Sequence, residues 1–501
     1  MVSGMSVSRQ NYIGGVGRDS VSGRVIKVFN PATEDESCRI PDSSREDIDL
    51  AVKAAQSALP GWSATPPVSR SRVLMRFREL LEKNRNEISG LISEEHGKTR
   101  EDASAELSRA IDVLEFACGI PQLLKGEHSH HASSSIDCWS MMLPVGVCAG
   151  ITPFNFPAMV PLWMVSIALA CGNTFILKPS EKDPSAPALI SKLLQEAGLP
   201  DGVFNLVHGS ADSVNAILDH PGIGAVSFVG STPVARHVYE RGSAAGKRVQ
   251  ALGGAKNHAV VLPDADMDMV AEQIAGAAYG SAGERCMAIS VVVAVGDDVG
   301  DQLADRLSEH ARSLKVGAFD TQPDLGPLIT MEHREKVLGL VDSGVKEGAQ
   351  LLVDGREAFF DKGYFLAPCL FDAVEPDMAI YQQEIFGPVL CIVRVSSYQD
   401  ALDLIAANPY GNGSAIFTGS GKLAQHFCEH ADTGMVGVNV PIPVPVAWHC
   451  FGGIKQSLFG PLHMHGPDGV RFFTRMRTVS ARWPEKLTGQ REANLNIPEV
   501  K

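Results

Sequence analysis

The sequence predicts an α/β protein built on parallel β-sheets. Short apolar runs recur between positions 145 and 252, and helical patterns of roughly ten to fifteen residues separate them. These runs are Val145–Ile151, Thr174–Leu177, Val203–Val207, Ala225–Val229 and Arg248–Leu252. A second alternating region extends from His258 to about Asn439. Strands that alternate with helices are typical of β-α-β units, which bind ligands beyond the carboxyl ends of their strands.

The composition is that of an ordinary globular protein. The 501 residues are 45% hydrophobic and 20% charged, and the formal net charge is −14. An acidic chain without a Lys/Arg-rich run is not built to bind nucleic acid or an anionic membrane. No apolar run reaches the roughly 18 residues that cross a bilayer, and Met1–Gln10 has no apolar signal core. Ten cysteines without a C-x-x-C pair indicate free thiols in a reducing compartment, so we expect a cytoplasmic protein.

The N-terminal part predicts one strand and three amphipathic helices. Val25–Phe29 has the pattern of a strand, and Ser44 stands where it can cap a following helix. A second helix is expected around Val73–Leu81, and a third from about Glu101 to Ala117, which carries Arg109. Such helices form a layer on one face of a sheet.

Three histidines, His128, His130 and His131, lie close together in the segment Gly126–Ser135. A metal site would need further ligands, and no carboxylate or cysteine stands at ligand spacing within this segment. We therefore expect solvated histidines and no bound metal.

Polar residues follow the first two apolar runs. Asn155 lies in the loop Thr152–Pro157, where two prolines stiffen the backbone and hold an amide donor in place. A carbonyl attacked by a thiolate becomes an oxyanion that fixed donors stabilise, so Asn155 is a candidate donor. Lys178 and Glu181 can hydrogen-bond the hydroxyls of an adenine ribose. Because the Glu181 carboxylate would repel a 2′-phosphate, this pair favours NAD over NADP.

The fourth apolar run is followed by Gly230, Ser231 and Thr232, a flexible turn that opens a helix. Backbone N–H groups at a helix N-terminus can bind a pyrophosphate. Each of these short motifs, taken alone, also fits an ordinary loop or helix cap.

Cys286 is the candidate nucleophile. It lies between the apolar run Ile274–Tyr279 and the strand-like run Ile289–Val295, at a junction where a side chain can face a cleft. A lone cysteine is more often packed in a core than reactive. The adjacent Arg285 would favour the thiolate.

Glu384 and Phe386 belong to the segment Gln383–Pro388. Glu384 fits a general base, a ribose ligand or a solvated surface acid. Phe386 offers a flat apolar surface for a nicotinamide ring.

Together these motifs resemble the NAD(P)-dependent aldehyde dehydrogenase superfamily, from roughly Tyr12 to Trp483. The resemblance implies that Cys286 is the nucleophile and that Asn155 forms an oxyanion hole with the Cys286 N–H. It places a further set of residues on the cofactor: Thr152, Phe154, Lys178, Glu181, Lys182, Ser231, Gly253, Glu384 and Phe386. It also implies an NAD-binding Rossmann-type domain (1–123 and 144–251), an α/β catalytic domain (252–445) and a small β element for bridging and oligomerisation (124–143 and 446–490).

One departure from the superfamily concerns its Glu-Leu-Gly-Gly-Lys segment, whose Glu activates the water that hydrolyses the thioester. Here the segment is Leu252–Lys256, and alignment on Lys256 puts Leu252 at the position of the base. Leucine cannot accept a proton, so hydrolysis should be slow and another group must release the acyl chain. A thiol of coenzyme A is the expected acceptor, since it ionises more readily than water.

This departure, with Glu284–Ala288, Asn408–Gly413 and Val438–Pro445, is similar to the CoA-acylating methylmalonate-semialdehyde dehydrogenase branch of the superfamily. Members of that branch use NAD and give propionyl-CoA or acetyl-CoA with loss of the substrate carboxylate. The resemblance assigns that carboxylate to Arg109 and Arg285. The alternative for Arg109 is a surface ion pair with Glu106 or Asp112.

Two other functions remain open at the level of sequence. One is a hydrolytic aldehyde dehydrogenase that uses another base, and the other is a non-catalytic protein that retains the fold. The stretch Gly469–Trp483 predicts an exposed strand pair whose edge needs a cover, so we expect a homo-oligomer, which the family implies is a tetramer built as a dimer of dimers.

Overall fold

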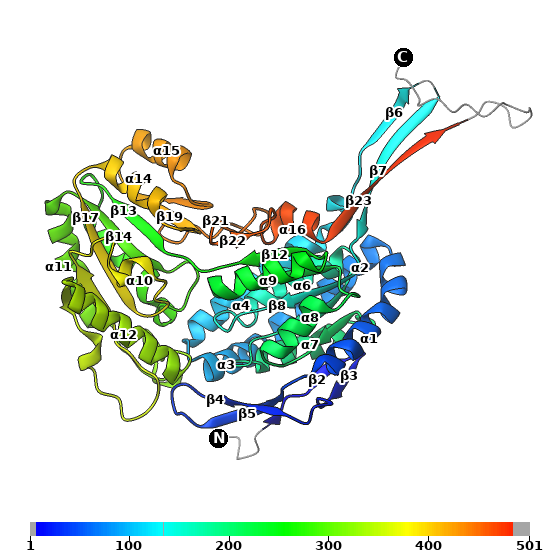
Figure 1. Cartoon of the computed structure of the whole chain (residues 1–501), viewed down its shortest axis with the longest axis horizontal. Helices are drawn as coiled ribbons and strands as arrows, with labels where there is room; N and C mark the ends of the chain where they lie inside the picture. Colours follow the sequence, from blue (N-terminus) through cyan, green and yellow to red (C-terminus); the bar gives the residue numbers. More distant parts are fainter. Residues whose placement is uncertain (1–6, 134, 484–501) are drawn as a thin grey trace, which may run out of the picture.

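In the computed structural model, which describes residues 7–133 and 135–483, the chain forms two lobes and a projecting arm (Figure 1). Each lobe contains one large sheet with helices packed against it. The sequence-predicted α/β class is confirmed.

The first lobe contains an eight-stranded sheet with the order β22-β12-β11-β8-β9-β10-β2-β3. Its parallel strands are β8 (Val147–Ile151), β9 (Thr174–Lys178), β10 (Phe204–Leu206), β11 (Ala225–Val229) and β12 (Arg248–Leu252). Each of the five predicted apolar runs coincides with one of these strands. β8 pairs with both β9 and β11, so the strand order reverses beside β8. The loops after β8 and β11 therefore meet at the edge where such sheets bind ligands.

The predicted N-terminal elements are present as β4 (Val25–Phe29), α1 (Arg45–Ala64), α2 (Pro67–Lys83) and α4 (Arg100–Cys118). The Ser44 N–H donates to the Asp47 carboxylate at 2.9 Å, which fixes the start of α1. A further helix, α3 (Arg85–His96), was not predicted. Asn84 both ends α2 and begins α3, so no turn signal separates the two helices in the sequence.

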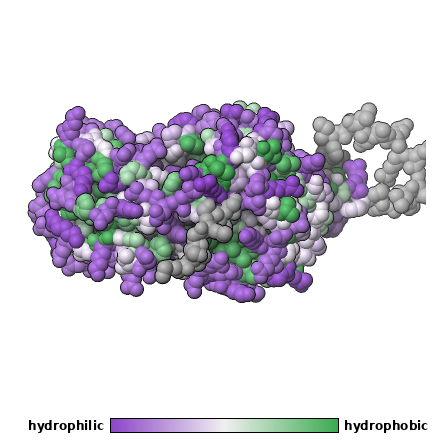
Figure 2. Space-filling model, turned by 90° about the horizontal axis from the view of Figure 1, so that it is seen from below, coloured by the Kyte–Doolittle hydropathy of each residue, from purple (hydrophilic) through white to green (hydrophobic). Residues whose placement is uncertain are grey.

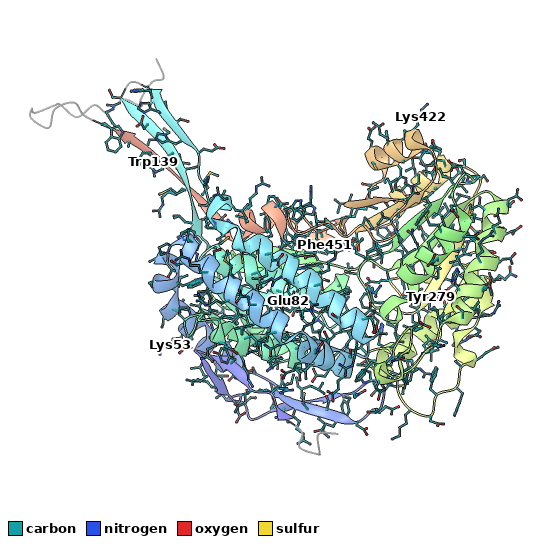
Figure 3. The ribbon with its side chains drawn as sticks, turned by 180° about the vertical axis from the view of Figure 1, so that it is seen from behind. Lys53, Glu82, Trp139, Tyr279, Lys422 and Phe451 are labelled. Carbon is teal, nitrogen blue, oxygen red and sulfur yellow. The ribbon has the colours of Figure 1, made fainter. Side chains whose placement is uncertain are left out.

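The second lobe contains a seven-stranded sheet with the order β15-β16-β17-β14-β13-β19-β20. Its strands are β13 (Asn257–Val261), β14 (Ile289–Val295), β15 (Gln350–Val353), β16 (Cys369–Asp372), β17 (Val389–Val395), β19 (Gly413–Phe417) and β20 (Met435–Val438). All of them run parallel except β15. Tyr279, labelled in Figure 3, ends α10 (Met267–Tyr279) in the core of this lobe.

The arm is an antiparallel sheet of β6 (His128–Ser133), β7 (Ile136–Pro144) and β23 (Thr474–Arg482). It projects away from both lobes and carries Trp139 (Figures 1 and 3). The expected strand pair in Gly469–Trp483 is wrong. The chain there forms the end of α16 (Gly466–Phe472), with a proline in its first turn, and then one long strand that pairs with β7.

The predicted domain limits stay a prediction. Of the segment assigned to the bridging element, β22 (Leu458–Phe459) joins the sheet of the first lobe, and β23 belongs to the arm. Positions 1–6, 134 and 484–490 of the predicted domains lie outside the described residues.

Hydrophilic residues cover most of the face drawn in Figure 2, with scattered hydrophobic groups between them. Among the helices of the described residues, none combines the length and the apolar character that a membrane span requires.

Candidate active site

Cys286 lies in a tight connection between the two main elements that precede and follow it. After α10, the 3₁₀ turn η1 (Gly280–Gly283) contains Ser281 and Ala282 with positive φ angles of 54° and 53°. A side chain on Gly283 would come 2.2 Å from the Gly387 carbonyl oxygen, so this approach requires glycine. The chain reaches β14 only at Ile289, and the sequence-predicted position of Cys286 between helix and strand is confirmed.

Two asparagines hold the Cys286 carbonyl oxygen. The side-chain amide of Asn257, at the start of β13, donates to it at 2.9 Å, and that of Asn412, just before β19, donates at 3.1 Å. Sequence reasoning missed both residues as parts of the site. The available signal was a polar residue at the edge of an apolar strand. A residue of this kind fixes the backbone of the nucleophile and does not touch the substrate.

Two cavities meet at Cys286. The larger one, about 320 Å³, is lined by Lys98, Asp102, Ala105, Glu106, Arg109, Phe156, Met159, Trp163, Arg285, Cys286, Met287, Ile442, Val444 and Phe451. The smaller one contains Glu384 and Phe386 together with Arg285 and Cys286. We call them the acyl-side and the cofactor-side cavity. Phe451, on the wall of the acyl-side cavity, is labelled in Figure 3 between the two lobes.

The Cys286 thiol is held in its neutral form. Burial, assisted by the nearby Glu384 carboxylate, raises the pKa of Cys286 to about 12. Arg285 acts in the expected direction, because its charge lowers this pKa, but desolvation outweighs it. The predicted influence of Arg285 on the Cys286 thiol is therefore present, but it is smaller than the effect of burial.

Asn155 is buried, and it lines neither of the two cavities, although its neighbour Phe156 lines the acyl-side cavity. The Lys98 ammonium donates to the Asn155 carbonyl oxygen at 2.6 Å and to the Glu106 carboxylate at 2.9 Å. Glu106 in turn accepts from the backbone N–H groups of Ala158 and Met159. This buried pair fixes the Asn155 backbone.

The two candidate arginines differ in their partners. Arg285 forms an ion pair with Asp102, and both side chains are mostly buried, with 21% and 24% of their surfaces exposed. Arg109 lies 3.6 Å from Asp112, and 47% of its side chain is exposed. The surface ion pair considered for Arg109 exists, yet Arg109 also lines the acyl-side cavity with Arg285. The structure thus brings both predicted residues to one cavity.

Leu252 ends β12 and is 3% exposed. Leu252 and Met287 belong to the same hydrophobic cluster, and Cys286 packs against this cluster. At this position the structure has an apolar side chain and no proton acceptor.

The carboxyl ends of β8 and β9 carry three of the predicted cofactor residues. Lys178 Nζ lies 3.1 Å from the Glu181 carboxylate. Burial acts to raise the pKa of Glu181, but the charges of Lys178 and Lys182 outweigh it, and the pKa stays below its usual value. The Thr152 hydroxyl is buried and has no hydrogen-bond partner among the residues that the structure describes. An unsatisfied hydroxyl beside a fixed Lys–Glu pair fits a polar ligand at this edge.

The residues after β11 and β12 lie close together, since a side chain at Gly253 would come 3.1 Å from Thr232 Oγ1, next to Ser231. Ser231 is the N-cap of α9 (Thr232–Ala244), and its side chain does not cap the helix. Thr232 Oγ1 accepts instead from the Gly254 N–H at 2.8 Å. The first N–H groups of α9 therefore lack a side-chain cap from Ser231, and such groups can bind an anion.

Phe154 connects the two lobes. Its ring lies 5.9 Å from the ring of Phe386, and the Lys182 ammonium lies 4.8 Å from the Phe154 centroid. Glu384 accepts from the Ala255 N–H at 2.9 Å, and burial raises the pKa of its carboxyl group. It is a carboxylate near the sulfur on the cofactor side, not in the place of Leu252.

The histidine segment differs from the expectation on one point. Asp137, just beyond the segment considered, brings a carboxylate to His130 and His131, and one ligand atom from each lies within 4.8 Å of the others. His130 Nδ1 is 2.9 Å from Asp137 Oδ1. The prediction considered only carboxylates within the segment, and Asp137 comes from outside it because the β6–β7 hairpin returns the chain. These residues lie on the arm.

Comparisons with known proteins agree with this geometry. The model of the aldehyde dehydrogenase family matches residues 18–479, so the chain belongs to the aldehyde dehydrogenase family.

Two curated relatives are close in sequence. The chain is 55% identical to a malonate-semialdehyde dehydrogenase of Pseudomonas aeruginosa over 471 residues, which cover 93% of this chain and 95% of that protein. It is 45% identical over 494 residues to the human mitochondrial acylating methylmalonate-semialdehyde/malonate-semialdehyde dehydrogenase, with 98% and 91% covered. A solved structure from Sinorhizobium meliloti 1021, described as a methylmalonate-semialdehyde dehydrogenase complexed with NAD, superimposes with a TM-score of 0.95 at 49% identity and covers 97% of this chain and 100% of its own.

Proposed function

We propose that this protein is an NAD-dependent enzyme that oxidises methylmalonate semialdehyde and malonate semialdehyde. The products are propionyl-CoA and acetyl-CoA, with loss of the substrate carboxylate. The observation that carries the proposal is the position of Cys286 between an arginine-lined acyl-side cavity and a cofactor-side cavity, with the apolar Leu252 at the position of the base. The names of the relatives at 45–55% identity agree with it.

Cys286 acts as the nucleophile: its thiol loses a proton to water, and the thiolate attacks the aldehyde carbon. The oxyanion accepts hydrogen bonds from the Asn155 side chain and the Cys286 N–H. Asn257 and Asn412 keep the Cys286 carbonyl turned away, which leaves the sulfur and the N–H for the substrate.

The residues at the carboxyl edge of the first sheet fit NAD. The unpartnered Thr152 hydroxyl, the Lys178–Glu181 pair and the uncapped start of α9 supply a polar atom, ribose ligands and phosphate-binding N–H groups. Phe154, Lys182, Gly253, Glu384 and Phe386 complete this set in the proposal. NAD held by these residues would supply the hydride acceptor, and the carbon attached to the Cys286 sulfur would then be at the oxidation level of a thioester.

Arg109 and Arg285 bind the substrate carboxylate, because a small anion in an enclosed cavity requires a fixed cationic partner. After oxidation, the bond to the carboxylate carbon breaks and its electrons enter the thioester carbonyl. Coenzyme A then takes the acyl group, because Leu252 cannot activate water.

A hydrolytic aldehyde dehydrogenase is the second candidate. Glu384 favours it, since this carboxylate shares the cofactor-side cavity with Cys286 and its pKa is raised, as suits a general base. Leu252→Glu separates the two readings. We expect this variant to gain steady NADH formation without coenzyme A, and no gain would contradict the role given to position 252.

The direct test is product analysis by mass spectrometry with each semialdehyde. We expect propionyl-CoA or acetyl-CoA when coenzyme A is present. Free carboxylic acid formed at the same rate without the thiol would overturn the acylation.

We further infer a homo-oligomer. The arm exposes Met476, with 68% of its surface accessible, and Trp483, with 60%. Large apolar side chains on a projecting sheet are typical of contacts between copies. A tetramer built as a dimer of dimers, a cytoplasmic location and the domain limits given above are parts of the same proposal.

A further inference from the structure

The acyl-side cavity contains five charged side chains, and two of them are committed to the fold. Lys98 and Glu106 form a buried ion pair, and Glu106 also accepts from two backbone N–H groups at the start of α6 (Met159–Ala170). Both side chains are buried in these interactions, so neither is available to bind a substrate. The charges that remain are those of Asp102, Arg109 and Arg285.

These three charges are arranged by one helix and one turn. Asp102 and Arg109 are seven residues apart on α4, which is about two helical turns, so they lie on the same face. Asp102 stands in the first turn of α4, where the helix dipole favours an anion. Arg285 is packed against Gly280, since a side chain at Gly280 would come 2.4 Å from its guanidinium. This packing and the ion pair with Asp102 fix Arg285.

The sum of the three charges is +1, because Asp102 already neutralises one arginine. A semialdehyde with one carboxylate therefore brings the cavity to neutrality. Without Asp102, the same substrate would face two uncompensated guanidinium groups. This cavity for an anionic substrate thus retains a carboxylate, Asp102, that competes with the substrate for one of the two arginines.

We propose that Asp102 is a positioning residue that weakens the hold of Arg285 on the substrate carboxylate, so that this carboxylate can leave. The proposal rests on the function proposed above. In the step concerned, the bond between the α carbon and the carboxylate carbon breaks. Its electron pair moves into the thioester carbonyl, carbon dioxide (or its hydrate, bicarbonate) departs, and the α carbon takes a proton from water.

Negative charge moves away from the arginines in this step, from the carboxylate to the thioester oxygen. A cation bound tightly to the carboxylate stabilises the ground state more than the transition state and raises the barrier. Because Asp102 also holds Arg285, this arginine binds the substrate carboxylate less tightly. The ground state is then stabilised less strongly relative to the transition state. Arg109, with its weaker partner at 3.6 Å, supplies the main binding charge.

The test uses Asp102→Asn and the conservative Asp102→Glu with saturating NAD. For malonate semialdehyde we expect Asp102→Asn to lower KM about tenfold, as one added charge-assisted hydrogen bond would. We also expect inorganic carbon to form at least tenfold more slowly than NADH in a single turnover, with malonyl-CoA appearing among the products. Asp102→Glu should restore the wild-type ratio of inorganic carbon to NADH, which is one to one.

Propanal, which has no carboxylate, is the matched control substrate, and its KM should change less than about twofold in Asp102→Asn. A raised KM for malonate semialdehyde with an unchanged ratio of inorganic carbon to NADH would overturn the proposal and leave Asp102 a support for Arg285. An equal loss of activity with propanal would overturn it as well. If the wild type formed no NADH from either semialdehyde, the proposed function itself would fail, and this result is distinct from the other two.

Discussion

The two cavities that meet at Cys286 differ in the state of their carboxylates. On the acyl side, both lining carboxylates are already held, Asp102 by Arg285 and Glu106 by Lys98. On the cofactor side, Glu384 has one backbone donor, and burial raises the pKa of its carboxyl group. The cofactor-side cavity therefore has a carboxylate, Glu384, that can accept a proton. Among the described residues, the carboxylates that line the acyl-side cavity are all in ion pairs.

The difference explains why hydrolysis and acylation can diverge within one fold. Water needs a base to attack a thioester, whereas a thiol of coenzyme A ionises with less help. In the proposed mechanism Leu252 stands at the position of the base, and the ion pairs of the acyl side do not replace that base. Substitutions in the acyl-side cavity and in the cofactor-side cavity should therefore have different effects on the kinetics.

The largest expected effect is at the sulfur that both cavities share. Cys286→Ala should reduce NADH formation by about 10⁴-fold or more, because no other group can form the thioester. The absorbance of NADH with malonate semialdehyde measures it. Cys428→Ala, at an exposed cysteine of α15 (Gly421–His430), is the control and should retain full activity. Substantial turnover by Cys286→Ala would remove the basis of the comparison.

The second prediction concerns the protonation of this sulfur. With a pKa of about 12, the thiolate fraction of Cys286 rises about tenfold per pH unit between pH 7 and 10. The rate of its alkylation by iodoacetamide in the free protein should rise in the same proportion, roughly 1,000-fold in total. Peptide mapping by mass spectrometry distinguishes Cys286 from the other cysteines. A rate already constant from pH 7 would mean that Arg285 outweighs burial.

A third prediction tests the acyl side alone. Arg109→Leu should lower kcat/KM for malonate semialdehyde about 100-fold, since a charge-assisted hydrogen bond contributes about 1.5–3 kcal/mol. The kinetics with propanal should stay within about threefold, because propanal has no carboxylate to bind. Arg306→Leu, which removes the surface partner of Asp268, is the matched control. An equal loss with both aldehydes would place Arg109 outside carboxylate binding.

The smallest effect is expected at the backbone of the nucleophile. Asn412→Ala removes one of two donors to the Cys286 carbonyl, which contributes about 1 kcal/mol. Steady-state kinetics should show kcat reduced about fivefold to tenfold, with the KM values for NAD and aldehyde little changed. A rise in KM without a change in kcat would mean that Asn412 shapes a binding surface instead.

Much of the fold was predictable because its signals are local. The five apolar runs of the first sheet match strands β8 to β12 within a few residues, since buried parallel strands need continuous apolar sequence. Cys286 was likewise placed correctly between α10 and β14. Local patterns failed at Gly469–Phe472, where a proline in the first turn supports a helix, and at α3, which follows α2 without a turn signal.

The parts of the site that sequence could not supply are those made by distant segments. Asn257 and Asn412 meet at one carbonyl although 155 positions separate them along the chain. Asp102 and Arg285 pair across the two lobes, and Asp137 reaches His130 only because a hairpin reverses the chain. Such contacts depend on tertiary packing, which no single motif encodes. The net effect of burial on the pKa of Cys286 belongs to the same class.

The most direct test of the account is rapid mixing of the enzyme with NAD and malonate semialdehyde, with and without coenzyme A. Without the thiol, we expect a burst of about one NADH per chain followed by a rate at least about 100-fold lower than with coenzyme A, because the thioester on Cys286 is not released. Continuous NADH formation at the same rate in both reactions would contradict the claim that Leu252 leaves the acyl enzyme without a base for water.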